Sequence, residues 1–299
     1  MKILRVLGKI LVVLAIVLLT ALGLIYWRSS SLMAQRIEVK EPALAIASDP
    51  AAIARGEHLA ITRGCTDCHS ADLGGRVLVD AFPIGVFAAP NLTRGKNGIG
   101  NRLDPVAIER AVRHGVGEAA RLLLYMPTTD FAALTDADTA DLIAYVSSVA
   151  PVDREVPPPS AGPLMRTLFL LGKAPLVYGL QIDQRAAHAN AVVAAANADY
   201  GHYLAHSCTG CHGQNFAGGH VPGTPPSFPS ARNITPDPAA GIGQWTKADF
   251  ATALRTGKRP DGSVLDPFMP YKAFATFTDS EVDALWAFLQ TVPGVAKAP

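Results

Sequence analysis

Two short motifs bring two thiols and an imidazole together in this chain of 299 residues. Residues 65–69 read Cys-Thr-Asp-Cys-His, residues 208–212 read Cys-Thr-Gly-Cys-His, and the two motifs contain all four cysteines. Two thiols one helical turn apart can form thioether bonds to the two vinyl groups of one porphyrin, and the adjacent histidine can then ligate the iron. We therefore expect two covalently bound haem c groups.

The residues of each motif have distinct predicted roles. The thioether anchors are Cys65, Cys68, Cys208 and Cys211, and the proximal iron ligands are His69 and His212. A Cys-x-x-Cys pair can also be a dithiol redox motif, and two such pairs can build one four-cysteine zinc centre. Neither alternative explains why a histidine follows both pairs. A disulfide framework is disfavoured because the motifs already use every cysteine.

A hexacoordinate haem iron needs a second ligand on the opposite face, and methionine sulfur is the usual neutral choice. Met126 lies 57 residues after His69, Met269 lies 57 residues after His212, and a proline follows each methionine. A single methionine is more often core filler. The equal spacing of two Met-Pro pairs instead favours Met126 and Met269 as distal ligands.

The equal spacing belongs to an internal repeat with a period of about 143 residues. Residues 89–93 (Ala-Pro-Asn-Leu-Thr) recur as residues 231–235 (Ala-Arg-Asn-Ile-Thr), and a Gly-Ile-Gly element also occurs in both halves. The chain is therefore predicted to hold two copies of one haem domain, at residues 48–152 and 189–299.

Capping signals indicate helices at both ends of each copy. Asp49 and Asp104 each precede a proline, which then occupies the first helical position. Thr278 begins a capping box ahead of an apolar stripe, and Thr135 opens the equivalent helix of the first copy. Gly- and Pro-rich loops without an alternating strand pattern separate these helices. We therefore predict an all-α fold of two tandem haem domains.

The N-terminal residues have a different composition. Lys2, Arg5 and Lys9 precede an apolar run of 18 residues from Ile10 to Trp27. Such a helix would span about 27 Å, which matches a bilayer core. The competing interpretation is a cleavable signal peptide, but the run is long for one and no good Ala-x-Ala site follows it. We predict an uncleaved transmembrane anchor at residues 1–30, with its amino end in the bacterial cytoplasm and the haem domains in the periplasm.

Residues 153–188 are predicted to form a linker with an apolar segment. A proline-rich stretch at 157–163 precedes residues 164–180, which are apolar but interrupted by Arg166, Lys173 and Pro175. The segment is too interrupted to span a membrane. Three placements are open: between the domains, at the membrane surface, or against a partner.

Several elements together resemble one family. The haem motifs, the Asn-Ile-Thr and Gly-Ile-Gly elements, an Arg-x-Gly at 255–257 and the Met-Pro-Tyr of the second copy are similar to the multihaem cytochrome c subunits of periplasmic membrane-bound alcohol, aldehyde and gluconate dehydrogenases. The resemblance covers nearly everything from residue 50 onward, although such subunits commonly carry three haem motifs. It implies that electrons leave a dehydrogenase subunit, pass through the haems and reach quinone or a terminal oxidase.

The resemblance also implies roles for residues around the haems. Asn91, Asn233 and Trp245 resemble haem-shell positions that hydrogen-bond a propionate or support the methionine side, and Arg102 stands where the first copy lacks the tryptophan. A turn asparagine and a core tryptophan are the alternative interpretations. Six further histidines are candidate alternative ligands, with surface or helix-end positions as the default: His58, His114, His188, His202, His206 and His220.

Two functional classes are open. In an electron carrier both irons are six-coordinate, whereas in a dihaem peroxidase one iron must offer an exchangeable position to peroxide. Methionine candidates in both copies favour the carrier. A formal net charge of +1 gives no reason to expect a nucleic acid partner. We therefore predict a non-enzymatic, membrane-anchored dihaem cytochrome c of a periplasmic respiratory chain.

Overall fold

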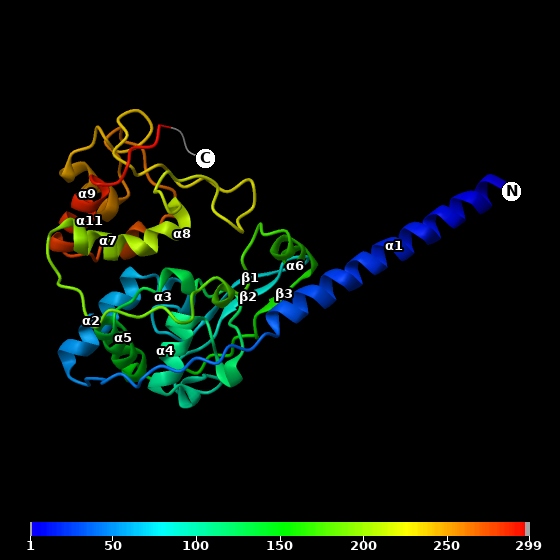
Figure 1. The fold of residues 1–299 in the computed structure, drawn as a ribbon, viewed down its shortest axis with the longest axis horizontal. Coiled ribbons are helices and arrows are strands. Elements are labelled where there is room, and N and C mark those ends of the chain that lie inside the picture. The colour runs from blue at the N-terminus through cyan, green and yellow to red at the C-terminus, as the bar shows by residue number, and fades with distance from the viewer. Residues whose placement is uncertain (1, 297–299) are drawn as a thin grey trace.

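Both copies of the repeat are built from helices and connecting loops, and the first copy lies next to the long N-terminal helix (Figure 1). The computed structural model describes residues 2–296. The first copy contains α2 (Pro50–Thr62), α3 (Cys65–His69), β1 (Arg76–Ala81), β2 (Gly85–Ala89), α4 (Pro105–His114) and α5 (Asp136–Ser148), with the 3₁₀ turns η1 (Gly100–Arg102), η2 (Glu118–Ala120) and η3 (Thr128–Asp130). The second copy contains α7 (Ala198–Ala205), η5 (His206–Cys208), α8 (Thr209–His212), α9 (Lys247–Thr256), α10 (Tyr271–Phe274) and α11 (Asp279–Leu289).

The four predicted helix starts are confirmed. Asp49 caps α2 by accepting from the Ala51 amide at 3.0 Å, and Asp104 caps α4 in the same way. Thr135 precedes α5, and Thr278 forms the expected capping box before α11. These side chains accept hydrogen bonds from amides that have no partner within the helix.

The expectation of an all-α fold is only approximately correct, because the first copy contains a small antiparallel sheet. β1 pairs with β2, and β2 pairs with β3 (Ser160–Ala161), which comes from the linker. Residues of β1 are exposed or half-buried without alternation. A strand that depends on a partner distant in the sequence leaves little local signal, which is why the sequence did not reveal it.

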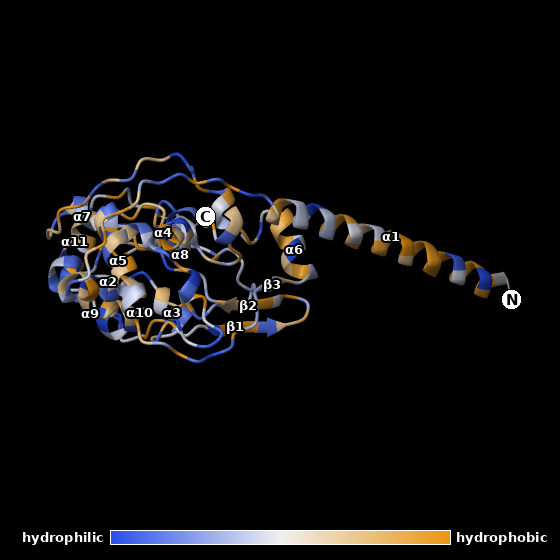
Figure 2. Cartoon of the chain, turned by 90° about the horizontal axis from the view of Figure 1, so that it is seen from below, coloured by the Kyte–Doolittle hydropathy of each residue, from blue (hydrophilic) through white to orange (hydrophobic). Residues whose placement is uncertain are grey.

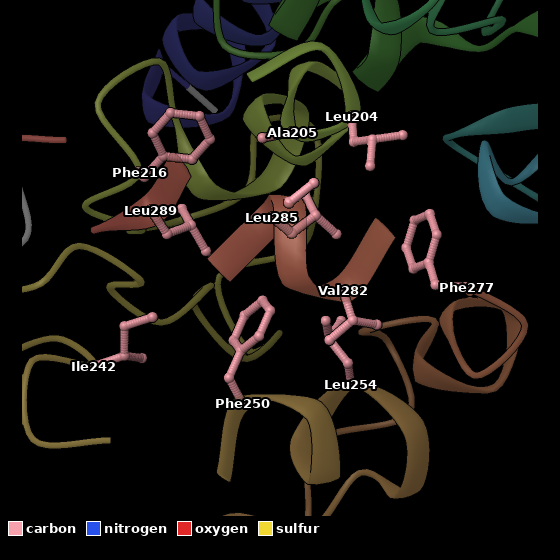
Figure 3. Packing of buried hydrophobic residues seen from close by; sticks show 11 residues of the cluster. Leu204, Ala205, Phe216, Ile242, Phe250, Leu254, Phe277, Val282, Leu285 and Leu289 are labelled. Atoms are coloured by element: carbon pink, nitrogen blue, oxygen red, sulfur yellow. The ribbon is translucent and has the colours of Figure 1, made fainter. Parts of the chain in front are cut away.

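Each copy has its own hydrophobic core. In the second copy, side chains from α7, α9 and α11 converge, including Leu204, Phe250, Leu254, Val282 and Leu285 (Figure 3). The predicted apolar stripe of α11 is therefore part of this core. In the first copy, α2, α4 and α5 supply an equivalent cluster.

The first and last helices of each copy cross at a glycine. A Cβ added to Gly56 of α2 would lie 2.0 Å from the Asp141 carbonyl oxygen of α5. The same atom on Gly201 of α7 would lie 1.9 Å from the Ala284 carbonyl oxygen of α11. Only glycine permits this backbone approach, and the approach holds α3 and α8 against their cores.

The N-terminal helix α1 (Lys2–Met33) projects away from the haem domains with its apolar side chains exposed (Figures 1 and 2). It is long and apolar enough to cross a membrane. Its last turns contact α6 (Pro163–Leu170), where Arg166 Nη1 donates to the hydroxyls of Ser29 at 2.8 Å and Ser30 at 2.9 Å. The Arg166 guanidinium also lies 4.4 Å from the centre of the Tyr26 ring. The end of α1 is thus fixed to the linker.

The apolar segment of the linker packs mainly against the first copy. Leu176 joins a cluster with Tyr125, and Val177 joins another with Val116. Leu176 and Val177 are fully buried, and the segment continues into the 3₁₀ turn η4 (Tyr178–Leu180). The segment is therefore part of the first domain's surface layer and connects that domain to α1.

Residues 34–48, which we call the strap, connect α1 to α2 along the first copy (Figure 1). Ile37 and Val39 pack on the Val116 cluster, and Leu44 and Ile46 pack on the first core. The strap is consequently a structural part of the first domain.

Replacing Gly201 with alanine is expected to lower the free energy of unfolding by about 2–3 kcal/mol, because the new methyl group meets a carbonyl that cannot move independently. The sign is opposite to the usual gain of about 1 kcal/mol for glycine to alanine within a helix. Thermal and denaturant unfolding measure the change. Gly294→Ala, whose Cβ would meet its nearest atom at 3.5 Å, is the control. Equal stability of the two variants would contradict the crossing.

Candidate haem sites

The two motif histidines are held by the same kind of hydrogen bond. His69 Nδ1 lies 2.9 Å from the Pro90 carbonyl oxygen, and His212 Nδ1 lies 2.7 Å from the Arg232 carbonyl oxygen. Because a carbonyl only accepts, Nδ1 carries the proton in each ring and Nε2 keeps its lone pair. Burial lowers the pKa of both imidazoles, which favours the neutral form that ligates iron.

The asparagines that follow these carbonyls act as clamps. The side-chain oxygen of Asn91 accepts from the Thr93 amide at 2.9 Å, and its Nδ2 donates to the Val152 carbonyl at 2.7 Å. Asn233 forms the equivalent bond to the Val295 carbonyl at 2.6 Å. These bonds match the turn interpretation and leave the propionate role without support. The asparagines therefore position the histidines through the preceding peptide.

The cysteines are free thiols that face apolar surroundings. Burial raises the pKa of Cys65 to about 12 and that of Cys208 to about 11. The second cysteines, Cys68 and Cys211, have raised pKa values for the same reason. A buried neutral thiol next to an apolar core suits thioether attachment to a porphyrin.

Each candidate distal methionine borders the same hydrophobic core as its own motif. Met126 and Cys65 border the first core, and Met269 and Cys208 border the second. Each copy thus provides two thiols, an imidazole with a free Nε2 and a thioether around one apolar centre. This donor set fits one haem c in each copy, with cysteines as anchors and with histidine and methionine as the iron ligands.

The two sites differ in one shell position. Trp245 borders the second core, which agrees with a core tryptophan. Its first-copy counterpart, Arg102, is exposed and pairs with Glu118 at 3.2 Å. The surroundings of the two haems therefore differ in polarity, and polarity tunes haem potentials.

The two copies contact each other through equivalent residues used twice. His58 Nε2 of α2 lies 2.9 Å from a carboxylate oxygen of Glu281 in α11, and the Tyr203 hydroxyl of α7 donates to Asp138 in α5. Tyr203 occupies the repeat position of His58, and Glu281 occupies that of Asp138. The interface therefore has an approximate two-fold symmetry, as in an isologous dimer.

A buried arginine connects the two haem motifs along this interface. Arg63 lies two residues before Cys65 and is 7% exposed. Its Nη1 donates to the Leu204 carbonyl at 2.7 Å and to the Ser207 hydroxyl at 3.0 Å, immediately before the second motif. Its guanidinium lies 5.3 Å from the centre of the Tyr203 ring. One positive charge is thus close to both attachment helices.

The turn η3 brings the methionine side of the first site against the second motif. The Thr129 carbonyl oxygen of η3 lies 3.1 Å from His206 Nε2. A Cβ added to Gly210, inside the second motif, would lie 2.7 Å from Asp130 Oδ2. Burial raises the pKa of Asp130 to about 7. A titratable carboxyl therefore lies against the second attachment helix.

Sequence reasoning did not identify Arg63 and Asp130, because their roles depend on how the two copies dock. The repeat offered one signal, since Arg63 and His206 occupy the same position relative to the motifs. Among the further histidines, His58 and His206 lie in the interface, whereas His114 is 1% exposed at the end of α4.

The Cytochrome c family profile matches residues 53–150 and 199–293, which are the two copies. The chain belongs to the cytochrome c family. It carries two covalently bound haem c groups, one in each matched segment.

Three relatives specify the resemblance. The fructose dehydrogenase cytochrome subunit of Gluconobacter japonicus is 42% identical over 106 residues, which are 33% of this chain and 22% of that protein. The cytochrome c subunit of an alcohol dehydrogenase (quinone) from Gluconacetobacter polyoxogenes is 46% identical over 90 residues, 30% and 19% of the two chains. A "diheme cytochrome c-type" protein of Cereibacter sphaeroides is 46% identical over 66 residues, 22% of each chain.

These matches span about a fifth of the length of each curated relative. All three relatives are cytochromes, and two are named as cytochrome subunits of dehydrogenases. This chain is a dihaem cytochrome similar to those subunits, and its match lies with their cytochrome components, not with a catalytic subunit.

Replacing Met269 with histidine tests the distal ligand of the second site. Imidazole stabilises ferric iron more than a thioether does, so this haem should stay low-spin while its potential falls on the order of 0.1 V, within the range of about 0.8 V that axial ligands span. Spectroelectrochemistry and the methionine-to-iron charge-transfer band report the change. Met165→His, in a cluster beside α6, is the control. An unchanged band in the Met269 variant would exclude Met269 as a ligand.

The buried Asp130 predicts a pH-dependent potential for the second haem. Its carboxyl is neutral below a pKa of about 7 and negative above it. The added negative charge stabilises oxidised iron, so the potential should fall as the pH rises through about 7. Redox titrations between pH 5 and 9 measure this slope, on the order of one unit either side of that pKa. Asp130→Asn should flatten it, whereas Asp261→Asn, an exposed carboxyl with a lowered pKa, should not. A slope that persists in Asp130→Asn would assign it to another group.

Proposed function

We propose that this chain is a membrane-anchored electron relay. It accepts electrons from a dehydrogenase on the periplasmic side and passes them through two haem sites towards quinone or a terminal oxidase of the respiratory chain. Bound haem c supplies one-electron exchange between ferric and ferrous iron. The protein holds the two sites close together and near the membrane.

The closeness of the two haem motifs is the observation that carries this proposal. Arg63 and η3 link the first site directly to the helices of the second. Burial raises the pKa of Tyr178 to about 12, with smaller contributions from Asp130, Cys211 and Cys68, so this phenol lies beside both motifs. Electron tunnelling slows steeply with distance. Two sites that share one interface are therefore suited to transfer between them.

The proposed ligands favour a carrier over a peroxidase. Met126 and Met269 each border the core of their own site, where a sulfur ligand would occupy the position that peroxide needs. The Asn91 and Asn233 clamps hold each imidazole in one orientation. A site whose ligands stay in place through a change of oxidation state loses little energy to rearrangement, which is the requirement for electron transfer.

The attachment of α1 supports a retained anchor. Ser29 is fully buried where α1 meets α6, and Arg166 donates to it. A cleaved leader would have no need of such contacts with the mature domain. The relatives named as dehydrogenase cytochrome subunits support a dehydrogenase as the electron donor.

Exposed apolar side chains next to the end of α1 also support a position at the membrane. Phe82, at the turn of the β1–β2 hairpin, is 89% exposed, and Leu171, at the end of α6, is 65% exposed. The Leu164 amide donates to the Pro83 carbonyl at 3.1 Å, which joins the hairpin to α6. Since α6 packs on α1, this apolar edge would meet the lipid surface beside the anchor.

Removing α1 tests the tether. The soluble variant should begin at Met33 behind a cleavable signal peptide, because the strap from residue 34 packs on the first domain. We expect it to be soluble, to bind two haems and to titrate like the full chain. Confinement to the membrane raises encounter rates with membrane partners, so the variant should not restore substrate-dependent respiration in cells that lack the full chain.

Full rescue by this soluble form would show that the tether is dispensable. Turnover of peroxide by the purified chain, with a high-spin ferric signal, would instead establish the peroxidase alternative. Identification of the proteins that co-purify from detergent-solubilised membranes would name the partner in either case.

A further inference from the structure

A second cluster of potential ligands lies on the far side of the first domain from its haem motif. Glu41 of the strap, His114 at the end of α4 and His188 of the linker each offer one atom, and these atoms lie within 4.8 Å of one another. The imidazoles of His114 and His188 meet edge to face at 5.7 Å between ring centres. Three segments far apart in the sequence therefore converge with one ligand each.

The protonation of His114 follows from its neighbour Gln184. Gln184 Nε2 donates to the carbonyls of Gly179 at 2.8 Å and His114 at 3.2 Å. This fixes the amide, so its oxygen must accept from His114 Nδ1 at 2.8 Å. In the neutral ring Nε2 is then a bare acceptor. A hydrogen bond that orients the other ring nitrogen in this way is typical of metal-ligating histidines.

The orphaned nitrogens of the cluster lack a protein partner. His114 is 1% exposed, and its Nε2, like that of His188, makes no hydrogen bond with any described residue. His114 Nε2 lies 3.4 Å from a carboxylate oxygen of Glu41, too far for a good hydrogen bond. In a tetrahedral zinc site with bonds of about 2.0–2.1 Å, neighbouring ligand atoms are about 3.4 Å apart. The spacing of this pair fits a shared cation.

The surrounding charges are negative in excess. Arg113 pairs with Glu109 at 2.9 Å and with Asp136 at 2.7 Å, and Glu41 adds a third carboxylate to the neighbourhood of that one guanidinium. Burial lowers the pKa of His188, and Arg113 acts in the same direction. A neutral imidazole in a negative environment is suited to a divalent cation.

We propose that Glu41, His114 and His188 form a binding site for one divalent transition-metal ion of the Zn²⁺ type, with a fourth position for water. Two imidazoles and one carboxylate are a common zinc ligand set. The site is separate from both haems, and its ligands come from the strap, the first domain and the linker. A bound ion would fasten the connection from α1 and the connection to the second copy onto the same helix end.

The test uses the full haem-loaded chain in detergent, freed of metal with a chelator. Isothermal titration with Zn²⁺ and elemental analysis after desalting should give one Zn²⁺ per chain. His188→Ala and Glu41→Gln should each weaken binding at least about tenfold, since even the loss of an outer-shell partner has that effect. Saturating Zn²⁺ should also slow proteolysis of the strap in the wild-type chain alone.

Two comparisons separate a specific site from other causes. His220→Ala removes an exposed histidine of the second copy, which bonds the Thr224 carbonyl, and should leave the stoichiometry unchanged. Haem absorption and circular dichroism check that the His188 variant, altered in an irregular segment, is folded. If the wild-type chain binds no stoichiometric Zn²⁺, or binds it as His188→Ala does, the proposal is overturned, and a protonated His114 paired with Glu41 takes its place.

Discussion

The hydrogen bond from each motif histidine to a backbone carbonyl is the constraint on which both haem sites depend. A free imidazole rotates and can carry its proton on either nitrogen. The Pro90 and Arg232 carbonyls remove both freedoms. Those carbonyls are themselves fixed, because the next residue is an asparagine whose amide ties the loop to the end of the domain. The order of chain segments thus converts one buried asparagine into a defined iron ligand.

Docking of the two copies adds a second level of order. Because Tyr203 and His58 occupy equivalent repeat positions and each bonds an acidic residue of the other copy, one contact is used twice. Near the approximate two-fold axis, however, Arg63 faces the second motif while His206 faces η3. The symmetry therefore brings the sites together, and the departures from symmetry give each site a different charged neighbour.

Much of this structure could be predicted from local patterns. Helix starts such as Thr278 depend on the residue itself and on the next three, and covalent haem motifs are equally local. The sheet was missed because β2 needs β3 from the linker as a partner. The interface role of Arg63 was missed for a related reason: a charged residue next to a motif is ordinarily exposed, and only the second copy buries it. Long-range contacts decided these features.

The two copies also differ in their relation to the membrane helix. The β-sheet, α6 and the strap all belong to the first copy or pack on it, and α1 is fixed to α6 through Arg166. The second copy is held through its interface with the first and through the linker, whose Ala189 carbonyl accepts from the Asp136 amide at 2.9 Å. In the proposed relay, the first haem site is consequently the one nearer the lipid. The second site, further from the anchor, is then the one more accessible to a partner in the periplasm.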